Sequence, residues 1–330
     1  MLVRIAIWGA GKMGQLHGTI YQGIEGVEIA CVIEKNETKA KSFSEEFQCP
    51  YIDSIEKIEP YNANGIDICL PTWLHKEAIQ KASNYFKWIF CEKPICLKEE
   101  EYSQICKSVE ASHASVMVGQ VLRFWNGYVK IKEILESGEI GKPRFITCCR
   151  RQKMPDWSAG NWLMDNSKSG GILMDLSIHD VDYLYWLFGK PKRLVCDIVK
   201  KQDTTLHSIL VLSYEDFCAI VNASWGMPKS FNKGELEATI EIVGDTGMIR
   251  YSGGNSLEII RDDDIQIYGL EETDGYLEEL LYFVGCIQKT IVPRRSSLSS
   301  VKGTMEILWA AMKSQEQKRA LCIEESAGTI

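Results

Sequence analysis

The stretch that decides the fold is Leu2-Val3-Arg4-Ile5-Ala6-Ile7-Trp8-Gly9-Ala10-Gly11-Lys12-Met13-Gly14. Its first part is a short apolar run, which predicts a buried β-strand over residues 2–8. The glycines predict a tight turn, and the chain from Lys12 to about Gln22 is expected to be helical. A strand, a glycine turn and a helix in this order begin a βαβ unit.

The glycines of this turn have the spacing GxGxxG, which is typical of dinucleotide-binding turns when it lies between a strand and a helix. Gly9 permits the tight turn, Gly11 lets the backbone approach a pyrophosphate, and Gly14 lets the helix pack closely on the strand. The amides at the helix N-terminus bind phosphate. We therefore expect a dinucleotide here; an ordinary glycine-rich turn is the alternative.

Glu34 follows a second predicted strand, residues 27–33, and lies about 20 residues beyond Gly14. A carboxylate at this place accepts hydrogen bonds from a ribose 2′-hydroxyl and repels a 2′-phosphate, which favours NAD over NADP. Lys35 would partly neutralise such a phosphate, so NADP remains possible. A solvated glutamate at the strand end is the alternative.

Strands continue to alternate with helices as far as about residue 120. The alternation predicts βαβ units and a doubly wound parallel sheet in an α/β domain. The predicted strands are 66–70, 88–91 and 115–118, and the predicted helices are 39–47, 76–84 and 98–112.

The alternation of strands and helices stops after a predicted helix at about 127–137. Closely spaced strands with few helices between them predict mainly antiparallel pairing in a second, α+β domain. The predicted strands are 144–151, 193–200, 207–214, 218–225, 235–243, 247–251 and 257–261, and the further helices are 171–188, 275–289 and 298–318. A chain of 330 residues is long enough for two such domains.

The composition is that of a globular protein, with 45% hydrophobic and 25% charged residues. The formal net charge of -8 argues against nucleic acid and anionic membranes as partners. No apolar run has the length of a membrane span, and the first residues resemble a strand rather than a signal peptide. The twelve cysteines form no CxxC pair, so we expect reduced thiols in a cytoplasmic protein rather than disulfides or a zinc site.

Glu92-Lys93-Pro94 follows the apolar run 88–91. A lysine at the carboxyl end of a parallel strand lies where such sheets bind ligands. Pro94 restricts Lys93 to an extended backbone and so limits where its side chain points. An ammonium group close to a nicotinamide can bind a substrate oxygen and stabilise a developing alkoxide. A solvated loop lysine is the alternative.

Asp175 and His179 lie four residues apart and therefore share one face of the helix predicted over 171–188. A histidine beside a carboxylate can take up a proton near neutral pH, while the carboxylate orients the ring or binds a substrate hydroxyl. Asp182, close to the same face, is expected to be structural. A surface polar pair is the alternative; a zinc site would lack a third ligand at a recognisable spacing.

In this order and spacing, the motifs resemble the Gfo/Idh/MocA oxidoreductases, which include glucose–fructose oxidoreductase and inositol dehydrogenases. The resemblance covers essentially the whole chain. It rests on the glycine turn 9–14, Pro71-Thr72 with His75, Glu92-Lys93-Pro94, the segment 137–143, and Gly170-Gly171 with Asp175, His179 and Asp182.

The resemblance implies an N-terminal Rossmann domain, residues 1–122, and a domain for substrate binding and oligomerisation, residues 123–330, built on a large open, mainly antiparallel sheet. It implies NAD(P)-dependent oxidation of a secondary alcohol in a sugar, sugar derivative or other polyol such as a cyclitol, by a homodimer or homotetramer without a metal. A dinucleotide-sensing regulator and a glycosidase that oxidises its substrate transiently are the alternatives.

The resemblance also assigns roles to single residues. Lys93 would contact the nicotinamide region and the substrate, Asp175 would hold a substrate hydroxyl, and His179 would be the acid/base. The implied cofactor contacts are Gly9, Gly11, Lys12, Met13, Gly14, Glu34, Pro71, Thr72, His75, Glu92, Lys93 and Gln120. A cis peptide before Pro94 is expected.

Arg123 and Trp162 are expected on the substrate side, with interdomain packing as the alternative for both. Residues 151–169 depart from the family pattern and are expected to set substrate identity. This segment is rich in Trp157, Asn161, Trp162 and Asp165.

Overall fold

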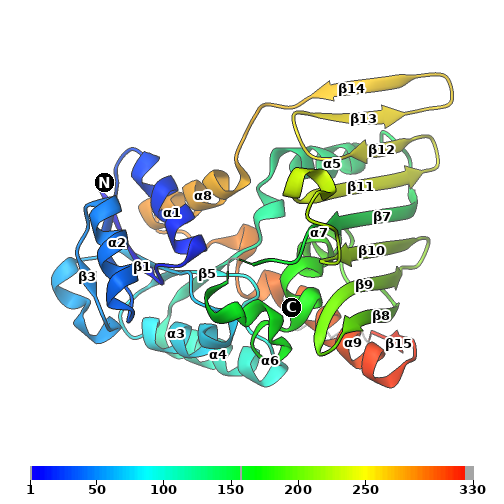
Figure 1. The fold of residues 1–330 in the computed structure, drawn as a ribbon. Coiled ribbons are helices and arrows are strands. Elements are labelled where there is room, and N and C mark those ends of the chain that lie inside the picture. Colours follow the sequence, from blue (N-terminus) through cyan, green and yellow to red (C-terminus); the bar gives the residue numbers. More distant parts are fainter. Residues whose placement is uncertain (1, 157, 324–330) are drawn as a thin grey trace. The chain divides into compact units, whose positions relative to one another are not determined.

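The computed structural model describes residues 2–156 and 158–323, which form two units (Figure 1). The first unit contains the chain up to Val121, a short segment that ends at Trp162, and Gly275–Val301. The second contains Leu122–Asp156, Leu163–Asp274 and the chain from Lys302 onward. Each unit therefore takes more than one stretch of sequence, whereas the sequence predicts a single division after residue 122.

The first unit is built on a six-stranded parallel sheet with the order β3-β2-β1-β4-β5-β6. The chain runs outward from β1 to β3 and then returns to β4 on the other side of β1, so the switch point lies between β1 and β4. The predicted doubly wound sheet is confirmed. The strands are β1 (Val3–Trp8), β2 (Val27–Ile33), β3 (Tyr51–Ile52), β4 (Gly65–Ile68), β5 (Trp88–Glu92) and β6 (Ser115–Gly119).

Helices cover both faces of this sheet, which is why β4 and β5 are buried along their whole length. Helix α1 contacts α2 and α8, and α3 contacts α4 (Figure 1). The helices are α1 (Lys12–Gly23), α2 (Glu37–Phe47), α3 (His75–Ala82), α4 (Glu99–Ser112) and α8 (Gly275–Lys289).

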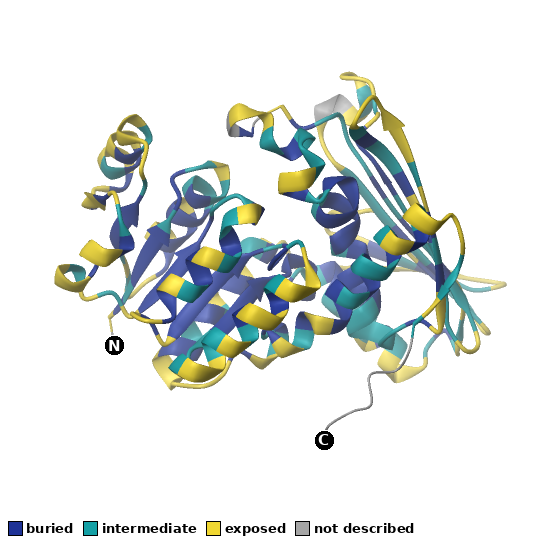
Figure 2. Cartoon of the chain, turned by 90° about the horizontal axis from the view of Figure 1, so that it is seen from below, coloured by how far each residue is buried: buried dark blue, intermediate teal, exposed yellow. Residues whose placement is uncertain are grey.

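The second unit contains a nine-stranded sheet with the order β14-β13-β12-β11-β7-β10-β9-β8-β15. Along β7, Ile146, Cys148 and Arg150 are buried while Phe145 is exposed, so one face is covered and the other is open. Figure 2 shows the buried residues gathered on the strands and on the helices that cover them. The strands are β7 (Pro143–Arg151), β8 (Arg193–Lys201), β9 (Thr204–Ser213), β10 (Cys218–Ser224), β11 (Glu237–Gly244), β12 (Met248–Tyr251), β13 (Ser256–Ile260), β14 (Ile265–Gly269) and β15 (Leu321–Cys322).

The pairing in this sheet is antiparallel except between β7 and β10, which run parallel. The chain leaves β7 through helices and returns as the meander β8-β9-β10, so its third strand joins β7 in the same direction. Strands β14 and β15 were not predicted, because Ile265 and Ile267 of β14 are exposed and β15 has only two residues.

Residues 171–188 are helical as predicted, but the helix is not α-helical throughout. Leu173–Ser177 forms a π-helical turn, and the α-helix α7 spans Ile178–Phe188. The other helices of this unit are α5 (Asn126–Ser137), α6 (Asn166–Ser169) and α9 (Lys302–Gln317). Within the described residues, no helix combines the length and apolar composition needed to cross a membrane.

Candidate functional site

The glycine turn between β1 and α1 has the backbone that a dinucleotide-binding turn requires. Gly9 has φ of 111°, and a Cβ on Gly14 would lie 1.9 Å from the carbonyl oxygen of Gly9. At Gly11, by contrast, a Cβ would meet no atom within 4 Å. This open space lets a diphosphate reach the start of α1, where Lys12 is exposed and Met13 is half-buried.

Glu34 lies at the end of β2 beside this turn. Its Oε2 accepts the amide hydrogen of Ala10 at 3.1 Å, and its Oε1 accepts that of Asn36 at 2.9 Å. These bonds fix the carboxylate next to the glycine turn. A carboxylate has about four lone-pair sites, so Glu34 keeps acceptors for ribose hydroxyls.

The segment after β4 carries Pro71, Thr72 and His75. Thr72 and His75 are buried. The His75 ring lies between two backbone carbonyls, with Nδ1 2.8 Å from Pro94 O and Nε2 2.7 Å from Leu70 O. Burial lowers the pKa of His75. The ring therefore connects the turn after β4 to the turn after β5, and a direct contact with the cofactor stays a prediction.

Lys93 is half-buried directly after β5. Oε2 of the Glu92 side chain accepts the amide hydrogen of Lys93 at 3.1 Å, which fixes the backbone of the turn. The Lys93–Pro94 peptide bond is cis, as predicted.

Gln120 follows β6, and its side chain is buried with 2% exposure. Neither its amide nitrogen nor its amide oxygen has a hydrogen-bond partner in the part of the chain that the structure describes. A buried amide without partners is costly, and a ligand amide or hydroxyl would satisfy it. Gly11 with its open space, Glu34 with spare acceptors and Gln120 thus fit a dinucleotide along the carboxyl edge of this sheet.

Trp162 belongs to the first unit. Its ring packs edge-on against Trp73, with ring centroids 5.2 Å apart, so it lies beside the turn after β4. Asp165 caps α6 by accepting the amide hydrogen of Ser167 at 3.0 Å. Asn161 has a left-handed backbone with φ of 53°. Trp157 lies outside the described residues, and the predicted role of the segment in substrate choice stays a prediction.

Asp175 and His179 belong to the second unit. Asp175 and His179 are partly exposed, whereas all the remaining residues from Gly171 to Leu184 are buried. The π-helical turn contains Asp175, so the simple α-helical spacing argument does not hold there. The burial pattern nevertheless places both side chains on the one accessible strip of this helical segment, and π-turns are frequent at functional sites.

Arg123 is 1% exposed and forms a two-pronged ion pair with Asp182. Its Nε and Nη2 donate to the two carboxylate oxygens at 2.8 and 2.7 Å. Thr304 adds a third bond to Asp182 at 2.7 Å. These bonds give Asp182 a structural role and engage Arg123 in packing; a substrate contact by Arg123 stays a prediction.

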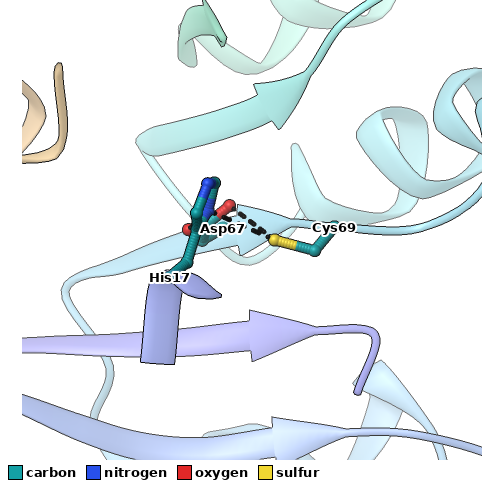
Figure 3. A group of neighbouring side chains, drawn as sticks. All are labelled: His17, Asp67 and Cys69. Carbon is teal, nitrogen blue, oxygen red and sulfur yellow. Dashed lines mark hydrogen bonds and ion pairs between the residues drawn. The ribbon is translucent and has the colours of Figure 1, made fainter. Parts of the chain in front are cut away.

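A buried polar cluster in the first unit was not predicted from the sequence. Figure 3 shows His17 of α1 against Asp67 of β4 and the neighbouring Cys69. The signal was an aspartate in the middle of the apolar run Ile66-Asp67-Ile68, since a buried charge requires a partner. Among the described residues, two groups of three side chains bring possible metal-ligand atoms close together. One group is His17, Asp67 and Cys69, and the other is His17, Glu92 and Glu279. Neither group contains Asp175 or His179.

Comparison with known families agrees with this architecture. Residues 3–120 match the oxidoreductase family with an NAD-binding Rossmann fold, and residues 128–250 match the GFO/IDH/MocA C-terminal domain. The chain belongs to the GFO/IDH/MocA family. It is therefore an oxidoreductase whose Rossmann domain binds NAD.

Individual relatives extend over most of the chain. A myo-inositol 2-dehydrogenase of Thermotoga maritima is 24% identical over 348 residues, covering 99% of this chain and 100% of the relative. A 2,7-anhydro-N-acetylneuraminate hydratase of Mediterraneibacter gnavus is 28% identical over 57% of this chain and 50% of its own. The crystal structure of an Agrobacterium radiobacter oxidoreductase with NAD+, L-tartaric acid and magnesium superposes with a TM-score of 0.85 at 19% identity, covering 98% of both chains.

Proposed function

We propose that this enzyme reversibly oxidises a secondary alcohol of a sugar, sugar derivative or cyclitol and passes the hydride to NAD. The observation that carries the proposal is the partly exposed Asp175 and His179 in an otherwise buried helical segment. The half-buried Lys93 at the ligand-binding edge of the Rossmann sheet supports it. The similarity to a myo-inositol 2-dehydrogenase along the whole chain favours a cyclitol.

In this proposal the nicotinamide supplies the hydride acceptor, and the protein residues move the proton and stabilise charge. His179 removes the proton of the substrate hydroxyl through its imidazole. Asp175 orients that ring or accepts a bond from a neighbouring hydroxyl. The ammonium of Lys93 stabilises the alkoxide that develops as the hydride leaves carbon.

The cofactor is proposed to lie along the edge formed by Gly11, Glu34 and Gln120. Glu34 favours NAD because its carboxylate repels a 2′-phosphate. The remaining predicted cofactor contacts and the substrate contacts of Arg123 and Trp162 belong to the same proposal.

The catalytic assignment is tested by Lys93→Met and His179→Ala. Each variant is expected to bind NADH with an affinity close to that of the wild type and to lose at least about 100-fold in turnover. The matched controls are Lys107→Met and His113→Ala, which change exposed residues of the first unit. Turnover at the wild-type level in both site variants, measured by NADH absorbance, would overturn the assignment.

A second candidate function is favoured by the similarity to a hydratase. The same residues would then oxidise the substrate transiently, return the hydride, and release a product with no net redox change. A glycosidase acting by transient oxidation belongs to this class. Product analysis separates the two functions, since only a dehydrogenase accumulates NADH together with a ketone.

A further inference from the structure

His17 lies at the centre of a buried cluster in the first unit. Its Nδ1 is 2.8 Å from Asp67 Oδ2, and its Nε2 is 3.3 Å from Glu92 Oε1. His17 and Asp67 are 0% exposed and Glu92 is 7% exposed. The titratable groups around this ring are Asp67 of β4, Cys69 just after it, Glu92 of β5, and Tyr276 and Glu279 of α8, while Tyr21 of α1 interacts with Asp67.

Both ring nitrogens of His17 thus face a carboxylate. A neutral imidazole has one N–H, so one nitrogen would present a lone pair to a carboxylate oxygen in a site without solvent. An imidazolium has an N–H on each side and attracts both carboxylates. Cys69 Sγ donates to Asp67 Oδ1 at 3.3 Å, as a neutral thiol does. Burial disfavours the charged form of His17, but the Asp67 carboxylate outweighs it and raises the pKa of the ring well above its ordinary value.

The cluster extends to the turn that carries Lys93. Glu92 Oε1 lies 3.3 Å from His17 Nε2 as an ion-pair contact without hydrogen-bond geometry, and Glu92 Oε2 accepts the amide hydrogen of Lys93. His17 itself lies on α1, three residues beyond Gly14 of the glycine turn. An ion-pair contact and a hydrogen bond therefore link α1, where the cofactor diphosphate is proposed to bind, to the backbone of Lys93.

We propose that His17 is a positioning residue, a buried imidazolium that holds the Glu92 carboxylate and thereby fixes Lys93 relative to the glycine-turn helix. The catalytic consequence rests on the proposed function of Lys93. The charge state of His17 and its effect on the turn do not depend on that function.

The alternative to a proton on His17 Nε2 is a divalent cation bound between His17 and the carboxylates that face it. His17 Nε2, Glu92 and Glu279 offer ligand atoms within 4.8 Å of one another. The proton is favoured because it needs no group from outside the chain. The distance of 2.8 Å between His17 Nδ1 and Asp67 Oδ2 is that of a direct hydrogen bond.

The charge state is tested by nitrogen NMR of protein labelled at its five histidines. The His17 signals are assigned by their loss in His17→Gln, with His113→Gln as the matched control for an exposed histidine. We expect both His17 nitrogens to be protonated at pH 7 and to remain so as the other rings titrate. A neutral His17 at pH 7, or a stoichiometric metal that is lost in His17→Gln, would overturn the proposal.

The positioning role is tested by a cycle of His17→Gln, Glu92→Gln and the double variant. His17→Gln leaves the Glu92 charge uncompensated, so turnover should fall by about 100-fold, as for a misplaced catalytic group. The double variant removes both charges, keeps an acceptor for the Lys93 amide, and should recover part of that loss. NADH affinity should change by less than about threefold in His17→Gln.

The NMR experiment and the turnover measurements can fail independently, so they test the role of His17 and the proposed function separately. If the wild type oxidises no polyol, the proposed function fails, while the NMR result still decides the charge of His17. If the wild type is active, an unchanged turnover in folded His17→Gln overturns the positioning role. A loss of thermal stability without any change in turnover overturns it in the same way.

Discussion

At the scale of single residues, the backbone of the turn that carries Lys93 is held by neighbouring side chains. Glu92 accepts the amide hydrogen of Lys93, and His75 binds the carbonyl of Pro94 on the other side. Turn geometry of this kind limits the freedom of a long side chain, as the proposed contact of Lys93 with a reacting oxygen would require.

The charge of His17 predicts a pH dependence of stability. Its pKa is raised in the folded state above 6.5, the value of an unperturbed histidine. The stabilisation is therefore fully present below pH 6.5 and is lost as the pH rises through the folded-state pKa. We expect the difference in unfolding free energy between wild type and His17→Gln to shrink at alkaline pH, measured by urea unfolding. A difference that grows with pH would contradict this sign.

At the scale of elements, two alanine variants of the glycine turn are expected to differ in their effects on stability and NADH binding. Gly14→Ala places a Cβ 1.9 Å from Gly9 O, so α1 must move and both stability and NADH binding should fall. Gly11→Ala meets no atom within 4 Å, so the protein should remain stable. Its methyl group would still occupy the space proposed for the diphosphate, and NADH affinity should drop by at least about tenfold.

Thermal melts and NADH fluorescence titrations measure the two effects separately. Gly11→Ala with unchanged NADH affinity would contradict the placement of the cofactor at this turn. Gly14→Ala with unchanged stability would contradict the close packing of α1 on β1.

The ion pair between Arg123 and Asp182 anchors the segment that follows the Rossmann strands to α7. Asp182→Asn would leave a buried guanidinium without its carboxylate, which typically costs about 3–5 kcal/mol. The matched control is Asp245→Asn, whose partner Arg144 is exposed and which should change stability little. Urea unfolding measures both; equal losses would contradict a structural role for the buried pair.

At the scale of the whole molecule, the nine-stranded sheet presents an open face. Phe145, Ile209 and Val243 on this sheet are exposed. We propose that a second copy of the chain covers this face. The wild type should then be a dimer or tetramer in light scattering, and Ile209→Asp should shift it toward the monomer. A monomeric wild type at micromolar concentration would contradict the proposal.

The Rossmann half could be predicted from the sequence because its strands are buried on both faces and form continuous apolar runs. The strand predicted over 27–33 has those bounds in the structure. The helix predicted over 275–289 also has its predicted bounds, but it belongs to the first unit and not, as predicted from the sequence, to the second domain. The parallel pairing of β7 with β10 could not be predicted, since a residue pattern reports which face is buried and not the direction of the neighbour.

The site was predictable only where a motif marks it. The glycine turn, Glu34 and Lys93 lie at strand ends that the sequence shows directly, whereas the π-helical turn around Asp175 has no distinct pattern of apolar residues. The cluster of His17 and Asp67 joins residues 50 positions apart, so the apolar run around Asp67 indicates a buried charge but does not identify His17 as its partner.

We propose that this GFO/IDH/MocA enzyme transfers hydride from a secondary alcohol to NAD. The most direct test is the absorbance of NADH while wild-type enzyme and NAD are offered inositols and sugars one at a time, with NADP in parallel. We expect steady formation of NADH with at least one of these polyols, faster reduction of NAD than of NADP, and loss of this activity in Lys93→Met. NAD binding without NADH formation from any of them would contradict it.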